Sequence, residues 1–130
     1  FVANYLPHTS GDGMEHLNST QIVHPIPWSA EAPVLPGVST ASHEYFHVWN
    51  VKRMRPVALG PFDYTQAIHQ PSLWVAEGWT NYYGNMAMHR AGVIERATLL
   101  RNVSNLVTTN LEHPGRRERS ARQASFDAPF

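Results

Sequence analysis

Residues 43–47 read His-Glu-Tyr-Phe-His, and this pentapeptide constrains the fold of the chain more than any other feature. Two histidines four positions apart share a face when the segment is an α-helix, because they then lie one turn apart. Both imidazoles can reach one metal ion, while Glu44, offset by one position, can act on a bound water. The pattern HExxH is typical of zinc-dependent peptide hydrolases, so it predicts His43 and His47 as metal ligands and Glu44 as the catalytic residue.

The chain contains no cysteine, which narrows the kind of metal site it can hold. A structural zinc site would usually contain cysteine ligands, whereas three histidine or carboxylate ligands with a fourth position for water are typical of catalytic zinc. The absence of cysteine also excludes disulfide scaffolds, thiol nucleophiles and iron–sulfur clusters. We therefore expect Zn²⁺ as the cofactor. The alternative interpretation is a pair of core histidines that hydrogen-bond locally.

The residues around HExxH favour a helix over about 39–53. Ser39, Thr40 and Ser42 offer side-chain oxygens that can cap the helix N-terminus. Apolar residues continue through the motif, and Pro56 forbids extension of the helix beyond it. The two histidines are thus expected well inside a regular helix.

A third ligand must come from elsewhere in the chain. The extended HExxHxxGxxH form is excluded, because Asn50 and Arg53 stand where it needs glycine and histidine. Glu77 is favoured because its neighbours in LWVAEGWTNYY are apolar, and a carboxylate there is costly unless a cation compensates it. An ion pair of Glu77 with Arg53 or Arg55 is the structural alternative. Four residues after the motif have side chains that can act as the third metal ligand: Asp63, His69, Glu77 and His89.

These residues predict a mechanism of metal-assisted hydrolysis. Zinc held by His43, His47 and Glu77 would lower the pKa of its water to about 7 and polarise the scissile carbonyl. Glu44 would take the proton of the water and pass it to the leaving amine. Asp63 or a backbone carbonyl is expected to orient the second nitrogen of a ligand histidine.

Composition and length favour a single globular unit. The 130 residues allow one domain, and 42% hydrophobic residues suffice for a packed core. The net charge is zero and no apolar run approaches the length of a transmembrane helix, so we expect neither a nucleic-acid partner nor a membrane partner. The chain starts with FVANYL and stops in FDAPF, which predicts a piece of a longer protein.

The pattern along the chain predicts an α+β fold that is mainly helical. Strands are expected at 1–6 and 14–24, and the four prolines within 25–38 predict a loop. Further helices are expected at 72–89 and 93–110, joined to the first by a connector at 56–71. The last helix should bury an apolar face made of Leu99, Leu100, Val103, Leu106 and Val107. A basic segment is expected to be exposed: Arg116, Arg117, Arg119 and Arg122.

Three collinear segments carry a resemblance to a known family. HEYFHVWNVKRMRP followed by LWVAEGWTNYY resembles the glycyl aminopeptidase family (M61) of gluzincin metallopeptidases. The stretch Gly13-Met14-Glu15-His16 is similar to the G-G-x-E-H segment of that family, and GRRERSARQASFDAPF resembles the region after its second ligand helix. The likeness runs over most of the chain.

The resemblance implies a zinc aminopeptidase that removes small N-terminal residues such as glycine or alanine from peptides. It implies a thermolysin-like (gluzincin) catalytic core with a HExxH helix, a glutamate-ligand helix and a short β edge. Carried over by position, His43, His47 and Glu77 match the zinc ligands and Glu44 the catalytic glutamate. The segment Gly13, Met14 and Glu15 would bind substrate, with Glu15 receiving the free amine. A carboxylate there fixes how far the N-terminus lies from the metal.

The chain departs from the family in two respects. Family members carry a flanking β domain and usually a PDZ-like domain, so residues 1–130 are expected to be a fragment of the catalytic domain. The oxyanion-stabilising tyrosine is expected beyond residue 130, since Tyr45, Tyr64, Tyr82 and Tyr83 do not lie at its place. Two alternatives stay open: a metal-retaining but catalytically incomplete peptide-binding fragment, and a gluzincin endopeptidase. The compartment, bacterial cytoplasm or periplasm, also stays open.

Overall fold

The computed structural model describes residues 1–26, 29, 31 and 36–128. Within these residues it contains a small sheet and several helices, about half of the chain being helical, so the expected mixed α+β architecture is confirmed. The strands are β1 (Val2–Pro7), β2 (Asp12–Glu15) and β3 (Ser19–His24). The helices are α1 (Val38–Phe46), α2 (Leu73–Arg90), α3 (Arg96–Glu112) and α4 (Ala121–Asp127), with 3₁₀ turns η1 (Val57–Leu59) and η2 (Pro114–Arg117).

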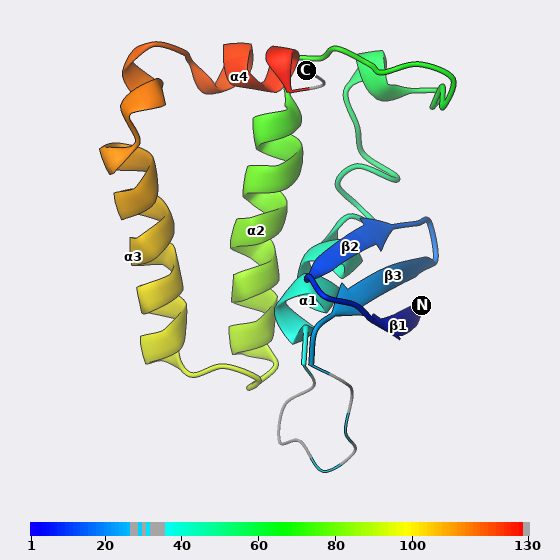
Figure 1. Ribbon diagram of the computed structural model, residues 1–130, viewed down its shortest axis with the longest axis vertical. Helices are drawn as coiled ribbons and strands as arrows, with labels where there is room; N and C mark the ends of the chain where they lie inside the picture. The colour runs from blue at the N-terminus through cyan, green and yellow to red at the C-terminus, as the bar shows by residue number, and fades with distance from the viewer. Residues whose placement is uncertain (27–28, 30, 32–35, 129–130) are drawn as a thin grey trace.

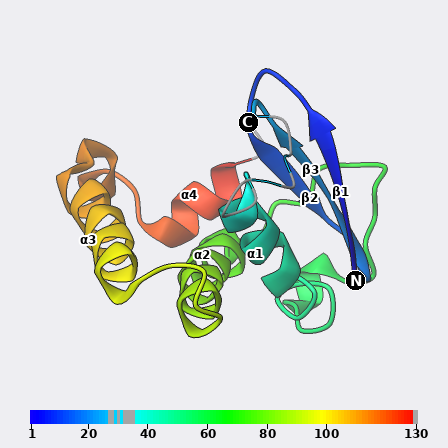
Figure 2. The same cartoon turned by 90° about the horizontal axis from the view of Figure 1, so that it is seen from below.

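The elements are arranged in successive layers. Figures 1 and 2 show the sheet on one side of α1, then α2, and then α3 farthest from the sheet. α4 lies across one end of α2. α1 is therefore the element between the sheet and the long helices, and side chains of α1 can meet both.

The sheet has the order β1-β3-β2, with β1 parallel and β2 antiparallel to β3. The single strand expected over 14–24 is wrong, because the chain turns back within it. His16 N donates to Ser19 O at 2.8 Å, and Leu17 and Asn18 form the bend between β2 and β3. Asn and Ser favour turns, and this signal lay inside an otherwise β-prone run. The hairpin makes β2, which carries residues 13–15, an edge strand.

α1 differs from its prediction at both ends. Its N-cap is Gly37, in the left-handed region at φ 73°, and no side chain caps the helix. The expected caps are therefore wrong, and Ser42 instead donates its hydroxyl hydrogen to Gly84 O in α2 at 2.9 Å. The regular helix ends at Phe46 rather than at 53, and residues 47–53 continue as irregular turns. His47 is thus the C-cap residue.

One stripe of α2 packs against α1 at very short range. The buried residues of α2 recur every four positions: Ala76, Thr80, Gly84 and Met88. A Cβ on Gly84 would lie 3.3 Å from His43 N and 3.4 Å from His43 Cα, which is tight against backbone. Glycine at 84 therefore allows the two helices to approach each other at the level of His43.

The C-terminal helices correct two further expectations. Of the apolar face expected on α3, Leu99 is buried, but Leu100, Leu106 and Val107 are 56%, 49% and 52% exposed. The element against which α3 mainly packs is α2, so the rest of its apolar face is left uncovered by the described elements. α4 was not expected from the sequence. It is capped by Ser120, whose hydroxyl accepts from Gln123 N, and Ser125 Oγ accepts from Trp74 N at the start of α2.

The connector, the first strand, the second helix and the basic segment can be compared directly with their predictions. The connector at 56–71 contains η1 as its regular element, and the expected strand at 1–6 and helix at 72–89 correspond to β1 and α2. The basic segment is exposed, as expected. Much of the expected loop at 25–38 lies outside the described residues. Among the described helices, none combines the length and apolar character needed to cross a lipid bilayer.

Replacing Gly84 by alanine is expected to destabilise the protein relative to replacing Gly78 by alanine. Both glycines lie in α2, but a Cβ on Gly78 meets nothing within 4 Å. Gly78→Ala should therefore raise the free energy of unfolding by up to about 1 kcal/mol through helix propensity. Gly84→Ala should lose roughly 1–3 kcal/mol relative to it by forcing α1 away. Urea unfolding of both variants measures the difference, and equal stability would contradict the close approach.

Candidate metal centre

Two imidazoles of α1 and its C-cap are brought together as the HExxH spacing predicts. His43 Nε2 lies 3.0 Å from His47 Nε2, and the two rings meet edge to face at 4.7 Å between centroids. The side chain of His43 is 19% exposed and that of His47 only 3%. One ring therefore closes the bottom of the site while the other borders solvent.

Glu77 of α2 completes the cluster. Its Oε2 lies 3.1 Å from His43 Nε2 and 3.6 Å from His47 Nε2. The alternative ion pair with Arg53 or Arg55 is wrong, because these guanidinium groups donate to backbone carbonyls such as Val48 O and Lys52 O. The sequence favoured Glu77 as a ligand because its neighbours are apolar and burial of its carboxylate was expected. The side chain is 47% exposed, so burial among apolar residues does not explain its position.

The separations of the three atoms suit a single small cation. Ligand atoms of a tetrahedral zinc site, each about 2.0–2.1 Å from the ion, lie roughly 3.3–3.4 Å from one another. The three separations between His43, His47 and Glu77 are 3.0, 3.1 and 3.6 Å. Two neutral imidazoles and a carboxylate are a catalytic donor set for zinc, and the group is compatible with a metal site.

The second nitrogen of each imidazole is held by an acceptor. His43 Nδ1 donates to Asn81 Oδ1 at 3.1 Å, and His47 Nδ1 donates to Asn50 O at 2.6 Å. Because both oxygens can only accept, each ring carries a hydrogen on Nδ1. Nε2 is then the nitrogen that can either donate to Glu77 as N–H or bind a metal ion through its lone pair. Neither Asn50 nor Asn81 was singled out as an orienting residue in the sequence, although a backbone carbonyl was expected in this role.

The chain is similar to known proteins both in sequence and in structure. Residues 37–130 match the family model of the M61 glycyl aminopeptidases, which covers α1 and every element after it. The chain belongs to the M61 family. A crystal structure of an aminopeptidase N family protein from Idiomarina loihiensis is similar, with a TM-score of 0.85 and 26% identity. The match covers 97% of this chain but 23% of that one. No curated protein is similar enough to count as a match.

Glu44 of the HExxH pentapeptide is buried beside the two imidazoles, with 6% of its surface exposed. Its Oε2 has no hydrogen-bond partner among the described residues. A buried carboxylate oxygen without a partner is costly, and a water lying over the metal ligands would satisfy it. The orphaned oxygen and the donor set beside it therefore fit a metal with a water to be activated.

The charges of the site are strongly coupled. Hydrogen bonds from His43 and His47 lower the pKa of Glu77 to about 2, so this carboxylate is ionised at neutral pH. Burial lowers the pKa of His47, but its hydrogen bond to Glu77 and that to Asn50 O outweigh burial and leave the pKa raised. Burial raises the pKa of Glu44, and the nearby imidazoles only partly offset this effect. A proton and a metal ion thus compete for the same atoms.

The segment expected to bind substrate, Gly13, Met14 and Glu15, lies on β2 next to Glu44. A Cβ on Gly13 would overlap the Glu44 carboxylate, so glycine lets the edge strand approach the site. The Met14 side chain is exposed, whereas Glu15 Oε1 lies 3.0 Å from Lys52 Nζ in a largely buried ion pair. The carboxylate expected to receive the substrate amine therefore already has a cationic partner.

The remaining ligand candidates lie in other contacts. Asp63 accepts from Thr65 and Gln66 in its own turn, so its expected role in orienting a ligand histidine is wrong. His69 Nδ1 pairs with Phe126 O of α4, and His89 Nδ1 pairs with Ile94 O. None of the three is part of the described cluster.

Replacing Asn81 by leucine is expected to weaken zinc binding about 10- to 100-fold, because His43 loses the acceptor that fixes its tautomer. Asn81→Asp keeps an acceptor and should bind zinc at least as tightly as the parent. Asn85→Leu is the matched control, since Asn85 lies one turn further along α2 and pairs with Asn102 instead. Competition with a fluorescent chelator measures the three affinities. Equal weakening in both leucine variants would contradict the assignment.

Gly13→Ala is expected to lower kcat at least 10-fold, because the added methyl group occupies the place of the Glu44 carboxylate and displaces the base. Zinc affinity should change little, since Glu44 is not among the three clustered ligands. Gly11→Ala is the control, because the shortest contact of a Cβ there is an ordinary one of 3.9 Å. Peptidase kinetics of the whole protein test this, and unaltered kcat in Gly13→Ala would refute the packing argument.

Proposed function

We propose that the protein is a zinc-dependent aminopeptidase with a thermolysin-like (gluzincin) catalytic core. The family membership indicates peptidase activity, and one observation carries the proposal further. Three ligand atoms of His43, His47 and Glu77 converge beside a buried Glu44 whose free oxygen has no described partner. A metal-retaining peptide-binding role without turnover would leave the burial of Glu44 unexplained.

Each residue of the site would have a separate role in the hydrolysis. Zinc held by His43, His47 and Glu77 would supply Lewis-acid activation of water and of the scissile carbonyl. Glu44 accepts a proton from the attacking water and delivers it to the leaving amine. Its raised pKa brings it closer to neutral pH, where a general base and acid works best. The Asn50 carbonyl and the Asn81 amide hold the two imidazoles in orientation throughout.

Glu15 is the residue that would make the enzyme an exopeptidase. It lies on the edge strand that touches Glu44, and its charge acts on Glu44 and His47. With Oε1 bound to Lys52, its second oxygen would receive the substrate ammonium. The family supports small N-terminal residues, glycine or alanine, as the preferred substrates, and peptides are the partners we propose.

The activity would belong to a longer protein. The chain spans less than a quarter of the similar aminopeptidase N family structure. We propose that residues 1–130 are part of a catalytic domain whose flanking β domain and PDZ-like domain lie elsewhere in that protein. The tyrosine that stabilises the oxyanion in gluzincin aminopeptidases is assigned to that remaining part.

The test is metal content and turnover of the whole protein. We expect about one zinc per chain, and hydrolysis of glycine and alanine anilides that chelation abolishes. Glu44→Gln should retain zinc but lose at least 100-fold in kcat, because the proton acceptor is gone.

The controls separate the alternatives. Acetylation of the substrate amine should abolish cleavage by an aminopeptidase, and equal cleavage of acetylated peptides would indicate an endopeptidase instead. Protein that binds zinc and peptide without turnover would support the non-catalytic role. A parent protein without zinc would refute the metal centre itself.

A further inference from the structure

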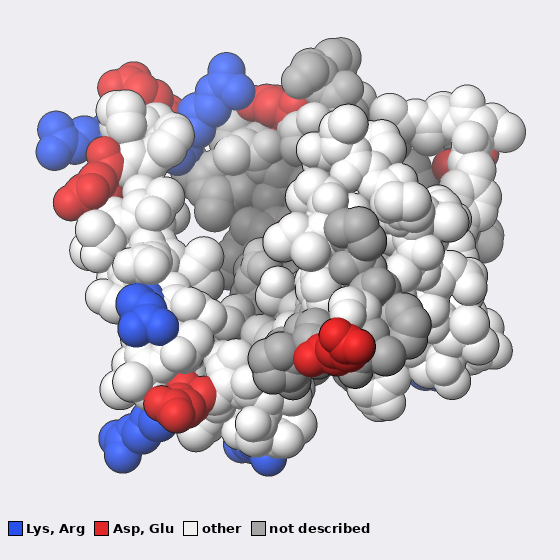
Figure 3. All heavy atoms as spheres, turned by 60° about the horizontal axis from the view of Figure 1, so that its bottom comes forward, with Lys and Arg blue, Asp and Glu red and all other residues white. Residues whose placement is uncertain are grey.

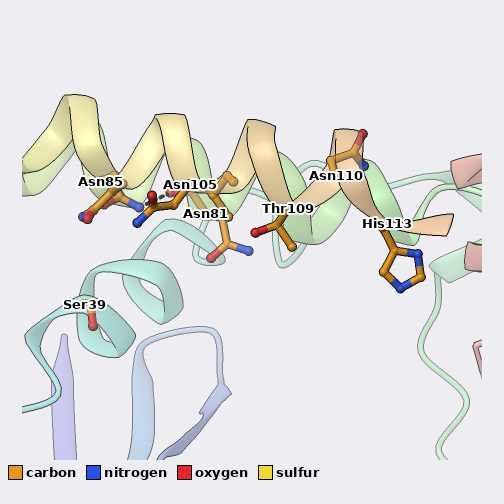
Figure 4. Close-up of a pocket in the computed structure, with 9 residues that line it drawn as sticks. Ser39, Asn81, Asn85, Asn105, Thr109, Asn110 and His113 are labelled. Carbon is orange, nitrogen blue, oxygen red and sulfur yellow. Dashed lines mark hydrogen bonds between the residues drawn. The ribbon is translucent and has the colours of Figure 1, made fainter. Parts of the chain in front are cut away.

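A groove of about 550 Å³ runs between α1, α2 and α3. Figure 4 shows Asn105 and Thr109 of α3, and His113 directly after this helix, projecting toward the side on which Asn81 and Ser39 lie. The described lining residues include five asparagines and no Lys, Arg, Asp or Glu: Ser39, Asn81, Asn85, Asn102, Asn105, Leu106, Thr109, Asn110 and His113. We call this feature the asparagine groove.

The groove presents hydrogen-bonding groups that are free to bind. Asn102 pairs with Asn85 at 2.8 Å, but the side-chain amide of Asn105 has no hydrogen bond to any described residue. An asparagine amide offers both a donor and an acceptor, as does each residue of a peptide main chain. Asn105 and its neighbour Thr109 are therefore matched to main-chain N–H and C=O groups.

The asparagine groove shares a wall with the metal centre. Glu77, Asn81 and Asn85 follow one another at four-residue intervals, so they lie on one face of α2. Asn81 lines the groove and also accepts from His43 Nδ1. The groove therefore begins beside the residues that would hold the metal and continues along α3.

The order of the layers gives the direction of a bound peptide. Glu15, which would hold the substrate amine, is the last residue of β2. Figure 2 shows β2 on one side of α1 and α3 on the far side of α2. A peptide anchored at Glu15 and passing Glu77 thus continues toward α3. The wall from 102 to 113 is about 16 Å long at 1.5 Å per residue, which accommodates about five residues of extended peptide.

The charge of the groove favours a neutral occupant. Figure 3 shows Lys, Arg, Asp and Glu side chains along the outer edge of the molecule on the α3 side. The described lining contains no Lys, Arg, Asp or Glu side chain. Such a wall fits main-chain amides, which are polar and uncharged.

We propose that the asparagine groove binds the main chain of the substrate on the C-terminal side of the scissile bond. The inference rests on the proposed aminopeptidase function and adds that the enzyme acts on peptides of about six residues in preference to dipeptides. Asn105 and Thr109 bind the leaving part of the peptide and take no part in the chemistry.

The test uses the whole protein with two substrates, glycine anilide and a hexapeptide beginning with glycine. The double variant Asn105→Leu with Thr109→Val should raise KM for the hexapeptide roughly tenfold through two lost hydrogen bonds, with kcat and the anilide kinetics unchanged. The matched control is Ser104→Leu with Thr108→Val, on exposed α3 positions outside the groove, and it should change neither substrate.

Three outcomes would overturn the proposal: an unchanged hexapeptide KM, an equal effect on the anilide, or an equal effect in the control. An unchanged KM would indicate that another segment of the longer protein fills the groove. If the parent turns over neither substrate, the proposed function fails, and the groove is then tested by calorimetry of the same hexapeptide. Weaker binding in the groove variant alone supports the groove, and equal binding overturns it.

Discussion

The contact on which the rest of the site depends is the close approach of α1 and α2 at Gly84. α1 and its C-cap carry both imidazoles and α2 carries the carboxylate, so the distance between these helices sets the separations of the ligand atoms. The hydroxyl of Ser42 donates to Gly84 O at this crossing. At the other end, the side chain of Asn50 donates to Ala76 O, directly before Glu77. Two polar anchors thus hold the histidines against the helix that carries their partner.

The same two hydrogen bonds help to explain how so many ionisable side chains can lie close together in this site. Two imidazoles, Glu77 and the buried Glu44 lie together, and Glu15 acts on them from β2. Such groups would repel or shift one another apart if the backbone could yield. Natural proteins break local rules of polar burial mainly at functional sites, where the remaining packing compensates. Here the compensation comes from short-range helix packing and from Gly13, which allows the sheet edge to close over Glu44.

The sequence predicted which side chains come together better than it predicted where the helices that carry them end. HExxH and the helix of Glu77 carry periodic signals, and these depend on local structure alone. The end of α1 at Phe46 could not be predicted, because the turns after it depend on Asn50 reaching α2, a contact 26 residues away in the chain. The orienting role of Asn81 was hidden for the same reason, since it exists only once α1 lies on α2. The predicted burial of the apolar face of α3 was wrong, because apolar residues at helical spacing indicate an amphipathic helix but do not indicate which element covers its apolar face.

The periodicity of α2 shows how one helix serves packing and chemistry together. Its buried stripe, Ala76, Thr80, Gly84 and Met88, is made of small residues up to Gly84, so α1 can approach closely over that length. The stripe displaced by one position, Glu77, Asn81 and Asn85, is therefore carried to the edge of the contact, within reach of His43 and of the asparagine groove. Larger residues on the buried stripe would move every member of the second stripe outward. Glu77, the orienting amide of Asn81 and the groove wall are thus positioned by side chains that belong neither to the cluster of His43, His47 and Glu77 nor to the groove lining.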